Sequence, residues 1–112
     1  MEINHDWGAM MELQLKELDN HTIRLVVTGE LSFADQSKFR EVFKSVEANK
    51  PSHICVDLAG CDFIDSAALG MLLLLKEKAD ILSADVTIAG AHGQVLKVLE
   101  LSRFGDLFAM ED

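Results

Sequence analysis

The stretch Asp57-Leu-Ala-Gly-Cys-Asp-Phe-Ile-Asp65-Ser66-Ala-Ala-Leu-Gly70 decides the fold of this 112-residue chain. Residues 52–58 form a near-continuous apolar run, which predicts a central strand that is covered on more than one side. A short acidic loop is expected next, followed by an apolar helix over 66–82. This order presents one serine hydroxyl at the start of a helix. The carboxylates expected around it are those of Asp57, Asp62 and Asp65.

Strands and helices alternate on both sides of this stretch. Apolar residues at every second position from residue 11 to residue 16 predict a half-buried strand, and Asp19-Asn20 makes a turn into a second strand over 21–27, which breaks at 28–32. The other expected elements are a helix over 33–48 with Ser32 as its N-cap, a strand over 84–89, a helix over 94–101 and a short strand within 104–110. The fold class is therefore α/β: a mixed sheet with an opening antiparallel hairpin, then β-α-β crossovers, with helices mainly on one face.

The length of the chain fits one domain, and we expect a flexible arm over 1–9 and the domain over 10–112. Hydrophobic residues make up 49% of the chain, enough to form a core without metal or disulfide support. No apolar run reaches the ~20 residues that span a bilayer, and the N-terminus does not resemble a secretory signal. We therefore expect a cytoplasmic protein that does not bind a membrane.

The charge of the chain excludes one class of partner. With 19 acidic and 10 basic residues, the net charge is −9. Nucleic acids are held largely by Lys and Arg contacts to phosphates, so we expect no nucleic-acid binding. A partner with a basic face would suit this chain better.

Ser66 has two interpretations. It can be the N-cap of the apolar helix and nothing more. Alternatively, the free N–H groups and the dipole of the helix N-terminus can hold a phosphate on this serine, and Ala67 and Ala68 leave room for a second protein. A phosphate adds roughly −1.5 to −2 charges, and beside existing carboxylates it would oppose docking. The site would then dock a partner when unmodified and reject it when phosphorylated.

The helix that begins at Ser66 carries more apolar residues than one face needs. The stripe expected to face the sheet is Ala68, Leu72, Leu75, Ala79 and Leu82. The surplus consists of Leu69, Met71, Leu73 and Leu74. Either neighbouring helices cover this surplus, or part of it docks a partner beside Ser66.

Other reactive residue types form no recognisable site. Cys55 and Cys61 have neither redox nor zinc spacing; we expect Cys55 to be buried and Cys61 to be partly exposed. The segment 90–93 resembles a phosphate-binding loop only loosely and is expected to be a turn. No Gly-x-Ser-x-Gly elbow surrounds Ser66, and the histidines are scattered. We expect no catalytic residue, no metal site and no cofactor.

The whole pattern resembles the STAS domain of bacterial anti-sigma factor antagonists. The resemblance rests on Asp57-Leu58, Phe63-Ile64-Asp65-Ser66 and Leu69-Gly70. Thr28-Gly29-Glu30-Leu31 is similar to the Gly-Glu-Leu turn of that family, and the segment 101–108 is similar to the region after its third helix. The chain departs from the family at Ala67 and Ala68, where a hydroxyl residue and a glycine are common, and at Ser32, where aspartate is common.

The resemblance implies a function. Ser66 would be the phosphoacceptor, and the docking surface would comprise Asp62, Asp65, Ser66, Ala67, Leu69, Gly70 and Leu73. The unphosphorylated protein would sequester an anti-sigma factor that is also a serine kinase of the histidine-kinase-like ATPase type. Phosphorylation would release that kinase and so regulate transcription in a bacterial cell, and a serine phosphatase would reverse the modification. The chain itself would not be an enzyme.

Two other functions remain open. STAS subunits of other machines look similar in this region, such as a non-switched partner of a lipid-transport ABC ATPase. Such a subunit would form a stable complex without phosphate on Ser66. A nucleotide or small-molecule sensor is the third hypothesis, and it predicts binding in equilibrium dialysis.

Overall fold

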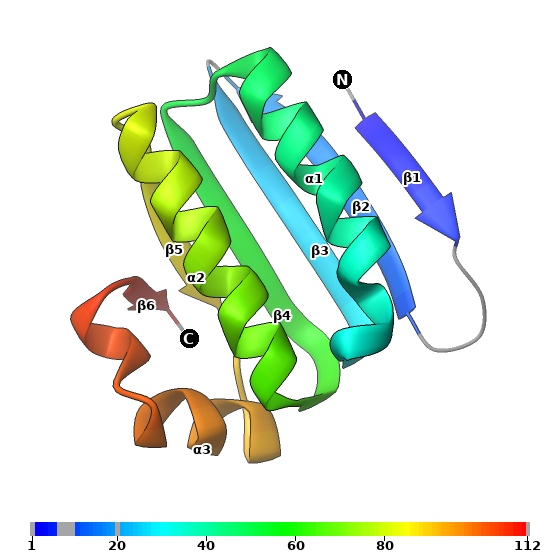
Figure 1. Cartoon of the computed structure of the whole chain (residues 1–112), viewed down its shortest axis with the longest axis vertical. Coiled ribbons are helices and arrows are strands. Elements are labelled where there is room, and N and C mark those ends of the chain that lie inside the picture. The colour runs from blue at the N-terminus through cyan, green and yellow to red at the C-terminus, as the bar shows by residue number, and fades with distance from the viewer. Residues whose placement is uncertain (1, 7–10, 20, 112) are drawn as a thin grey trace.

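The protein is built on one six-stranded sheet in which spatial order follows chain order. The computed structural model describes residues 2–6, 11–19 and 21–111. The strands are β1 (Glu2–Asp6), β2 (Met11–Asp19), β3 (Thr22–Leu31), β4 (His53–Ile64), β5 (Asp85–Ala89) and β6 (Ala109–Glu111). Strands β1, β2 and β3 are antiparallel neighbours, whereas β3, β4, β5 and β6 run parallel (Figure 1). The predicted hairpin followed by parallel crossovers is confirmed.

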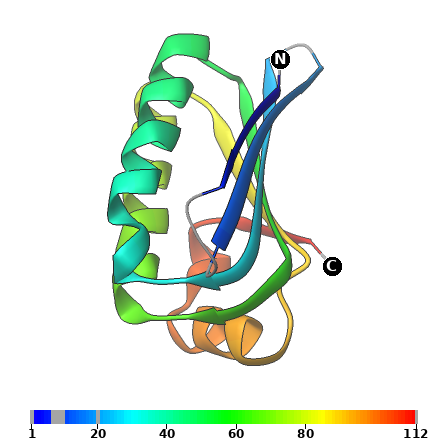
Figure 2. The same ribbon diagram turned by 90° about the vertical axis from the view of Figure 1, so that its right-hand side faces the viewer.

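The helices lie on one side of this sheet and at one end of it. They are α1 (Gln36–Asn49), α2 (Ser66–Ile81) and α3 (Gly93–Leu101), with short 3-10 turns η1 (Phe33–Asp35) and η2 (Phe104–Asp106). Figure 2 shows α1 and α2 side by side against one face, with α3 below the end of the sheet. The predicted α/β fold class is therefore confirmed. No helix in the described ranges is both long enough and apolar enough to cross a bilayer.

The core lies between the sheet and the two long helices. On β3, the buried residues Ile23, Leu25 and Val27 alternate with partly exposed ones, as expected for a strand with one covered face. On α2, the predicted stripe is confirmed: Ala68, Leu72, Leu75 and Ala79 are fully buried, and Leu82 packs against the core. A fully buried Leu side chain contributes about 1.5–3 kcal/mol, so this stripe anchors α2 to the sheet.

The predicted acidic loop before Ser66 is wrong, because β4 continues through it to Ile64. Two extra residues in β4 shift its register against β3, one between the pairs Val26–Asp57 and Thr28–Gly60 and one before the pair Glu30–Phe63. Each such β-bulge adds a residue to one strand only and interrupts the alternation of its side chains. The buried residues consequently recur at every third position: Leu58, Cys61 and Ile64.

Other boundaries also differ from the prediction. The segment 28–32 does not break the second predicted strand, because β3 pairs with the extended β4 as far as Leu31. An irregular arm was predicted over 1–9, but Glu2–Asp6 forms strand β1 beside β2, and residues 7–9 lie outside the described ranges. The predicted C-terminal strand is confined to Ala109–Glu111, because Phe104–Asp106 turns into η2.

Two glycines provide a matched test of this backbone. Gly90 has a φ of 74°, and a Cβ there would lie 2.9 Å from the Cβ and 3.0 Å from the Cα of Ala59, whereas a Cβ on Gly70 in α2 would meet nothing within 4 Å. We expect Gly90→Ala to lower the free energy of unfolding by about 1–3 kcal/mol. Gly70→Ala should raise it by about 0.5–1 kcal/mol. Urea denaturation of both variants measures this, and equal stabilities would contradict the geometry.

Candidate functional site

Ser66 is exposed at the first position of α2, but it is not the residue that caps the helix. The N-cap is Asp65, whose backbone is extended and whose Oδ1 accepts a hydrogen bond from the Ala68 N–H at 2.9 Å. The prediction of Ser66 as N-cap is therefore wrong by one position, because the carboxylate of Asp65 reaches the same N–H group. The Ser66 hydroxyl has no hydrogen-bond partner in the described part of the chain.

Asp65 also joins α2 to a second element. Its Oδ2 accepts a hydrogen bond from the backbone N–H of Phe33 at 3.1 Å, and its own N–H donates to the Leu31 carbonyl at 3.3 Å. Both carboxylate oxygens thus accept backbone N–H groups, one from α2 and one from η1. This arrangement fixes the backbone directly before Ser66 and leaves the hydroxyl free for chemistry.

Of the three acids predicted around Ser66, Asp57 lies elsewhere in the structure. Asp62, the extra residue of the second bulge in β4, is exposed, and Asp65 is committed to the cap. Asp57 lies on the helix-free face of the sheet, because its neighbours Val56 and Leu58 are buried under the helices. Its Oδ2 accepts a hydrogen bond from Arg24 at 2.6 Å, so Asp57 belongs to a separate ion pair.

That ion pair shifts the ionisation of Asp57. Burial alone raises the pKa of this carboxyl, but the Ala59 N–H, which donates to Oδ1 at 2.9 Å, and Arg24 together outweigh it. The pKa of Asp57 therefore lies below its usual range. The hydrogen bond with Asp57 also raises the pKa of Arg24, so its guanidinium stays charged.

Exposed apolar side chains lie on the elements that meet at the start of α2. Phe33 is 63% exposed on η1, whose first N–H is bound to Asp65, and Phe63 is 42% exposed three residues before Ser66. Leu73 is 41% exposed on α2. The sequence pattern does not indicate that either phenylalanine is exposed. It predicts Phe33 at the start of a helix and Phe63 in a loop.

The remaining predicted docking residues lie along the first two turns of α2. Gly70 and Leu73 are exposed, whereas Ala67 and Leu69 are half-buried. Of the surplus apolar residues, Met71 is buried and Leu74 is 49% exposed. Neighbouring elements therefore cover part of the surplus, and Leu73 and Leu74 remain on the surface.

Two side chains from the α3 region also hold the end of β4. Gln94 Nε2 donates to the Ile64 carbonyl, and Gln94 Oε1 accepts from the Ile64 N–H, each at 3.1 Å. His92, the N-cap residue of α3, places Nε2 2.8 Å from the Ala59 carbonyl oxygen. No local sequence pattern indicates these contacts, because they join residues about 30 positions apart.

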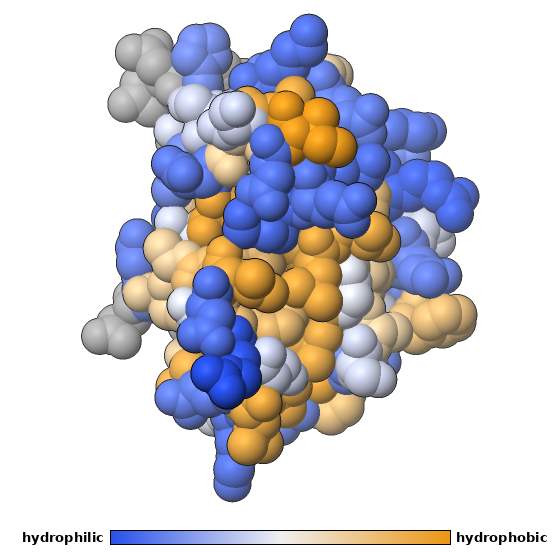
Figure 3. All heavy atoms as spheres, turned by 60° about the vertical axis from the view of Figure 1, so that its left-hand side comes forward, coloured by the Kyte–Doolittle hydropathy of each residue, from blue (hydrophilic) through white to orange (hydrophobic). Residues whose placement is uncertain are grey.

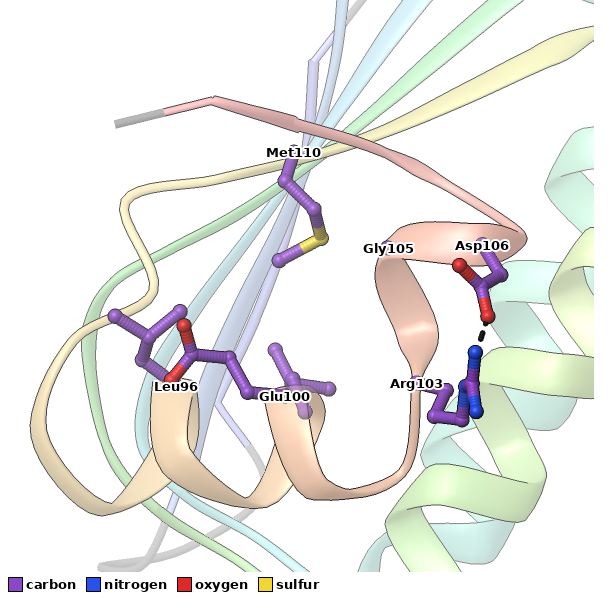
Figure 4. A pocket seen from close by; sticks show the side chains of 7 residues that line it. Leu96, Glu100, Arg103, Gly105, Asp106 and Met110 are labelled. Carbon is purple, nitrogen blue, oxygen red and sulfur yellow. Dashed lines mark hydrogen bonds and ion pairs between the residues drawn. The ribbon is translucent and has the colours of Figure 1, made fainter.

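A pocket of about 490 Å³ lies between α3, η2 and β6 (Figure 4). Its lining residues are Leu96, Leu99, Glu100, Arg103, Gly105, Asp106 and Met110. Arg103 Nε donates to Asp106 Oδ2 at 3.1 Å, so two of the three charged side chains of the lining are paired, and Glu100 is the third. The lining contains no hydroxyl, thiol or imidazole, the groups that nucleophilic catalysis uses most often. Figure 3 shows that apolar atoms form a band on this side of the molecule, bordered by hydrophilic residues.

Within the residues that the structure describes, the cysteines and histidines form no reactive cluster. Both cysteines are free and buried, so the predicted partial exposure of Cys61 is wrong: the bulges turn its side chain into the core. Burial raises the pKa of both thiols, which keeps them protonated. Among the described residues, no group of three His, Cys, Asp or Glu side chains could hold a metal ion.

Comparison with known proteins agrees with this geometry. A family model described as "Mlab, STAS domain" matches residues 15–110. A STAS-domain containing protein of Pseudomonas aeruginosa is 34% identical over 94 residues, covering 84% of this chain and 92% of that protein. An anti-sigma factor antagonist from Mycobacterium paratuberculosis has a similar structure, with a TM-score of 0.79 at 17% identity, covering 90% of this chain and 85% of that one.

The anti-sigma factor antagonist SpoIIAA has the same fold. Its unphosphorylated form aligns with a TM-score of 0.72 at 17% identity, covering 89% of this chain and 87% of that one. The phosphorylated form of the Bacillus protein aligns with a TM-score of 0.70 at 17% identity, covering 88% and 89%. At these identities, the likeness to the solved structures concerns the fold alone.

The cap of α2 can be tested with neighbouring acids. We expect Asp65→Ala to lower the free energy of unfolding by about 1–2 kcal/mol, because it removes the acceptor of the Ala68 N–H. Asp65→Asn should retain most of the stability, since asparagine also caps helices. Asp62→Ala is the matched control and should change stability by less than about 0.5 kcal/mol. If chemical denaturation found the two alanine variants equally stable, Asp65 would not be the cap.

The ion pair on the opposite face predicts a dependence on pH. Because the pKa of Asp57 is lowered in the folded state, this group stabilises the fold above its unfolded pKa, about 4, and the contribution is lost as pH falls further. Arg24→Gln should therefore be less stable than the original at pH 7, and the difference should shrink between about pH 4 and pH 2. Thermal unfolding across this range measures it; a difference independent of pH would contradict the assignment.

Proposed function

Since this chain belongs to the STAS-domain family, we propose that it is a protein-binding regulator that is switched by phosphorylation of Ser66. The unphosphorylated form binds and sequesters an anti-sigma factor that is also a serine kinase of the histidine-kinase-like ATPase type. Phosphorylation at Ser66 releases the kinase, and a serine phosphatase restores the binding form. The chain acts in the cytoplasm and catalyses no reaction itself.

The observation that carries this proposal is that Asp65, and not Ser66, caps α2. A serine that caps a helix uses its oxygen to accept a backbone N–H group, so its hydroxyl is engaged in the cap. Here the carboxylate of Asp65 holds the Ala68 N–H, and the Ser66 hydroxyl is exposed without an intramolecular partner in the described chain. Modification of Ser66 therefore alters the surface and leaves the cap in place.

The surroundings of Ser66 explain why one phosphate would be decisive. Phe33, Phe63 and Leu73 offer exposed apolar area on η1, β4 and α2, the three elements that meet near Ser66. A partner that buries this area must also desolvate whatever Ser66 carries, and a doubly charged phosphate loses much hydration free energy in such an interface. A shift of about 3 kcal/mol in partner binding corresponds to a hundredfold change in affinity. That range is sufficient for a switch.

The structural neighbours are compatible with this function. SpoIIAA is described as an anti-sigma factor antagonist and is known in both unphosphorylated and phosphorylated forms. The kinase partner and the regulation of transcription rest on the family resemblance alone, and they are part of the proposal.

A second candidate function is a permanent STAS subunit of another machine, such as a lipid-transport ABC ATPase. One observation favours it: Leu101, Leu107 and Met110 are 77%, 49% and 37% exposed on the α3–β6 side, where Figure 3 shows the apolar band. Permanent interfaces are larger and more hydrophobic than switched ones. This side of the molecule, together with the Ser66 end, would give a permanent partner such an area.

The two candidates differ in the state of Ser66 in the cell. We expect protein purified from its own host to carry a phosphatase-sensitive addition of ~80 Da, the mass of one phosphate group, in at least one growth state. Intact-mass spectrometry with and without phosphatase detects it. Ser66→Ala should lose the addition, whereas Ser37→Ala, which removes an exposed serine of α1, should keep it.

The absence of this mass in every growth state, together with a stable complex that survives purification, would contradict the switch. The permanent-subunit function would then be preferred. An addition that persists in Ser66→Ala would place the modification elsewhere on the chain.

A further inference from the structure

Gln94 occupies a position that a strand would normally take. Strand β5 pairs with β4 only as far as Ala89 beside Asp57, so the extended end of β4 has no strand neighbour on that side in the described chain. There the amide of Gln94 both donates to and accepts from the backbone of Ile64, at 3.1 Å in each direction. This is the pair of hydrogen bonds that an adjacent strand would supply to one residue.

The end of β4 is consequently held on both edges. On one side, Ile64 pairs with Leu31 of β3, and the next residue, Asp65, donates to the Leu31 carbonyl. On the other side, Gln94 holds Ile64 from α3. The backbone that enters α2 has little freedom to shift, so the position of the Ser66 hydroxyl is defined by β3, α2 and α3 together.

We propose that Gln94 is a positioning residue for the phosphorylation of Ser66, an inference that rests on the proposed function. In that step the Ser66 Oγ attacks the γ-phosphorus of ATP. The bond from this phosphorus to the oxygen that bridges it to the β-phosphate breaks, ADP leaves, and the hydroxyl proton passes to a base of the kinase. The attacking oxygen must lie in line with the breaking bond. Gln94 favours this alignment by fixing Ile64, two residues before Ser66.

A positioning role predicts a particular kinetic effect. Gln94 is exposed apart from its amide contacts, so its removal buries no charge and leaves little cavity. Phe33 of η1 and Leu73 of α2 lie on elements that Gln94 does not hold by a hydrogen bond, so this part of the exposed apolar surface stays in place. Loss of Gln94 should therefore reduce the rate of phosphoryl transfer rather than the affinity for the kinase. Because a displacement of about 1 Å can cost up to a hundredfold in rate, we expect a decrease of roughly tenfold.

The test compares three variants with the original chain. Gln94→Ala removes both hydrogen bonds to Ile64. Gln94→Glu keeps an acceptor for the Ile64 N–H but loses the donor to the Ile64 carbonyl. Lys97→Ala changes an exposed residue of the same helix that has no contact with β4, and it is the matched control.

Each purified variant is added at increasing concentration to ATP-supplemented lysate of a host strain that lacks this chain, which supplies the kinase. The initial rate of phosphate incorporation at Ser66 gives a maximal rate and a half-saturating concentration. We expect Gln94→Ala to lower the maximal rate roughly tenfold with a half-saturating concentration within about twofold of the original. The maximal rate of Gln94→Glu should lie between those of Gln94→Ala and the original chain, and the maximal rate of Lys97→Ala should match that of the original.

Amide hydrogen exchange controls for unfolding. In Gln94→Ala, the Ile64 N–H should exchange faster while that of Val56, in the centre of the same strand, keeps its protection. Faster exchange at Ile64 with an unchanged maximal rate would overturn the positioning role. A higher half-saturating concentration with an unchanged maximal rate would show that Gln94 acts in docking, and it would also overturn the positioning role. If the original chain acquires no phosphate, the proposed function itself fails.

Discussion

The carboxylate of Asp65 is the constraint on which the candidate site depends. One of its oxygens holds the N–H of Ala68 in α2, and the other holds the N–H of Phe33 in η1. A single side chain thus sets where α2 begins and how closely the connection between β3 and α1 approaches it. This link holds the backbone of the exposed Phe33 close to the start of α2, in addition to the contacts that Leu31 makes with Ile64 and Asp65.

The same arrangement explains how a charged modification could act without unfolding the domain. The α2 helix is anchored by its fully buried stripe, and its N-terminus is satisfied by Asp65. A phosphate on Ser66 would lie at a helix N-terminus, where the dipole favours negative charge. Its cost would appear only when a partner removes water from the site. Binding and folding are therefore separated, which suits a reversible switch.

Much of the fold could be predicted from the sequence, because strand alternation and helical stripes report local burial directly. The alternating residues of β3 and the Ala68–Ala79 stripe of α2 are examples. The end of β4 could not be predicted, since its two bulges convert a two-residue period into a three-residue spacing of Leu58, Cys61 and Ile64. That spacing does not match the pattern of a regular strand, and the sequence pattern predicts a loop there.

Part of the site could be predicted. Ser66 and Leu73 are exposed, but the cap lies one residue earlier than predicted, through a local contact of Asp65 with Ala68. Asp57 faces the other side of the sheet, and no local pattern indicates the contacts of Phe33 and Gln94. These three differences involve contacts between residues about 30 positions apart in the chain. Short-range rules can locate a helix start, but they do not show what else is brought to it.

A phosphate on Ser66 should change the surface and leave the Asp65 cap intact. Phosphoserine can be incorporated at position 66 during translation, and the amide spectrum of the labelled protein can be compared with that of the unmodified chain. We expect shifts confined to residues near Ser66, with the Ala68 N–H still protected from exchange and still dependent on Asp65. Loss of that protection, or shifts spread along α2 and into the sheet, would contradict a switch that acts only at the surface.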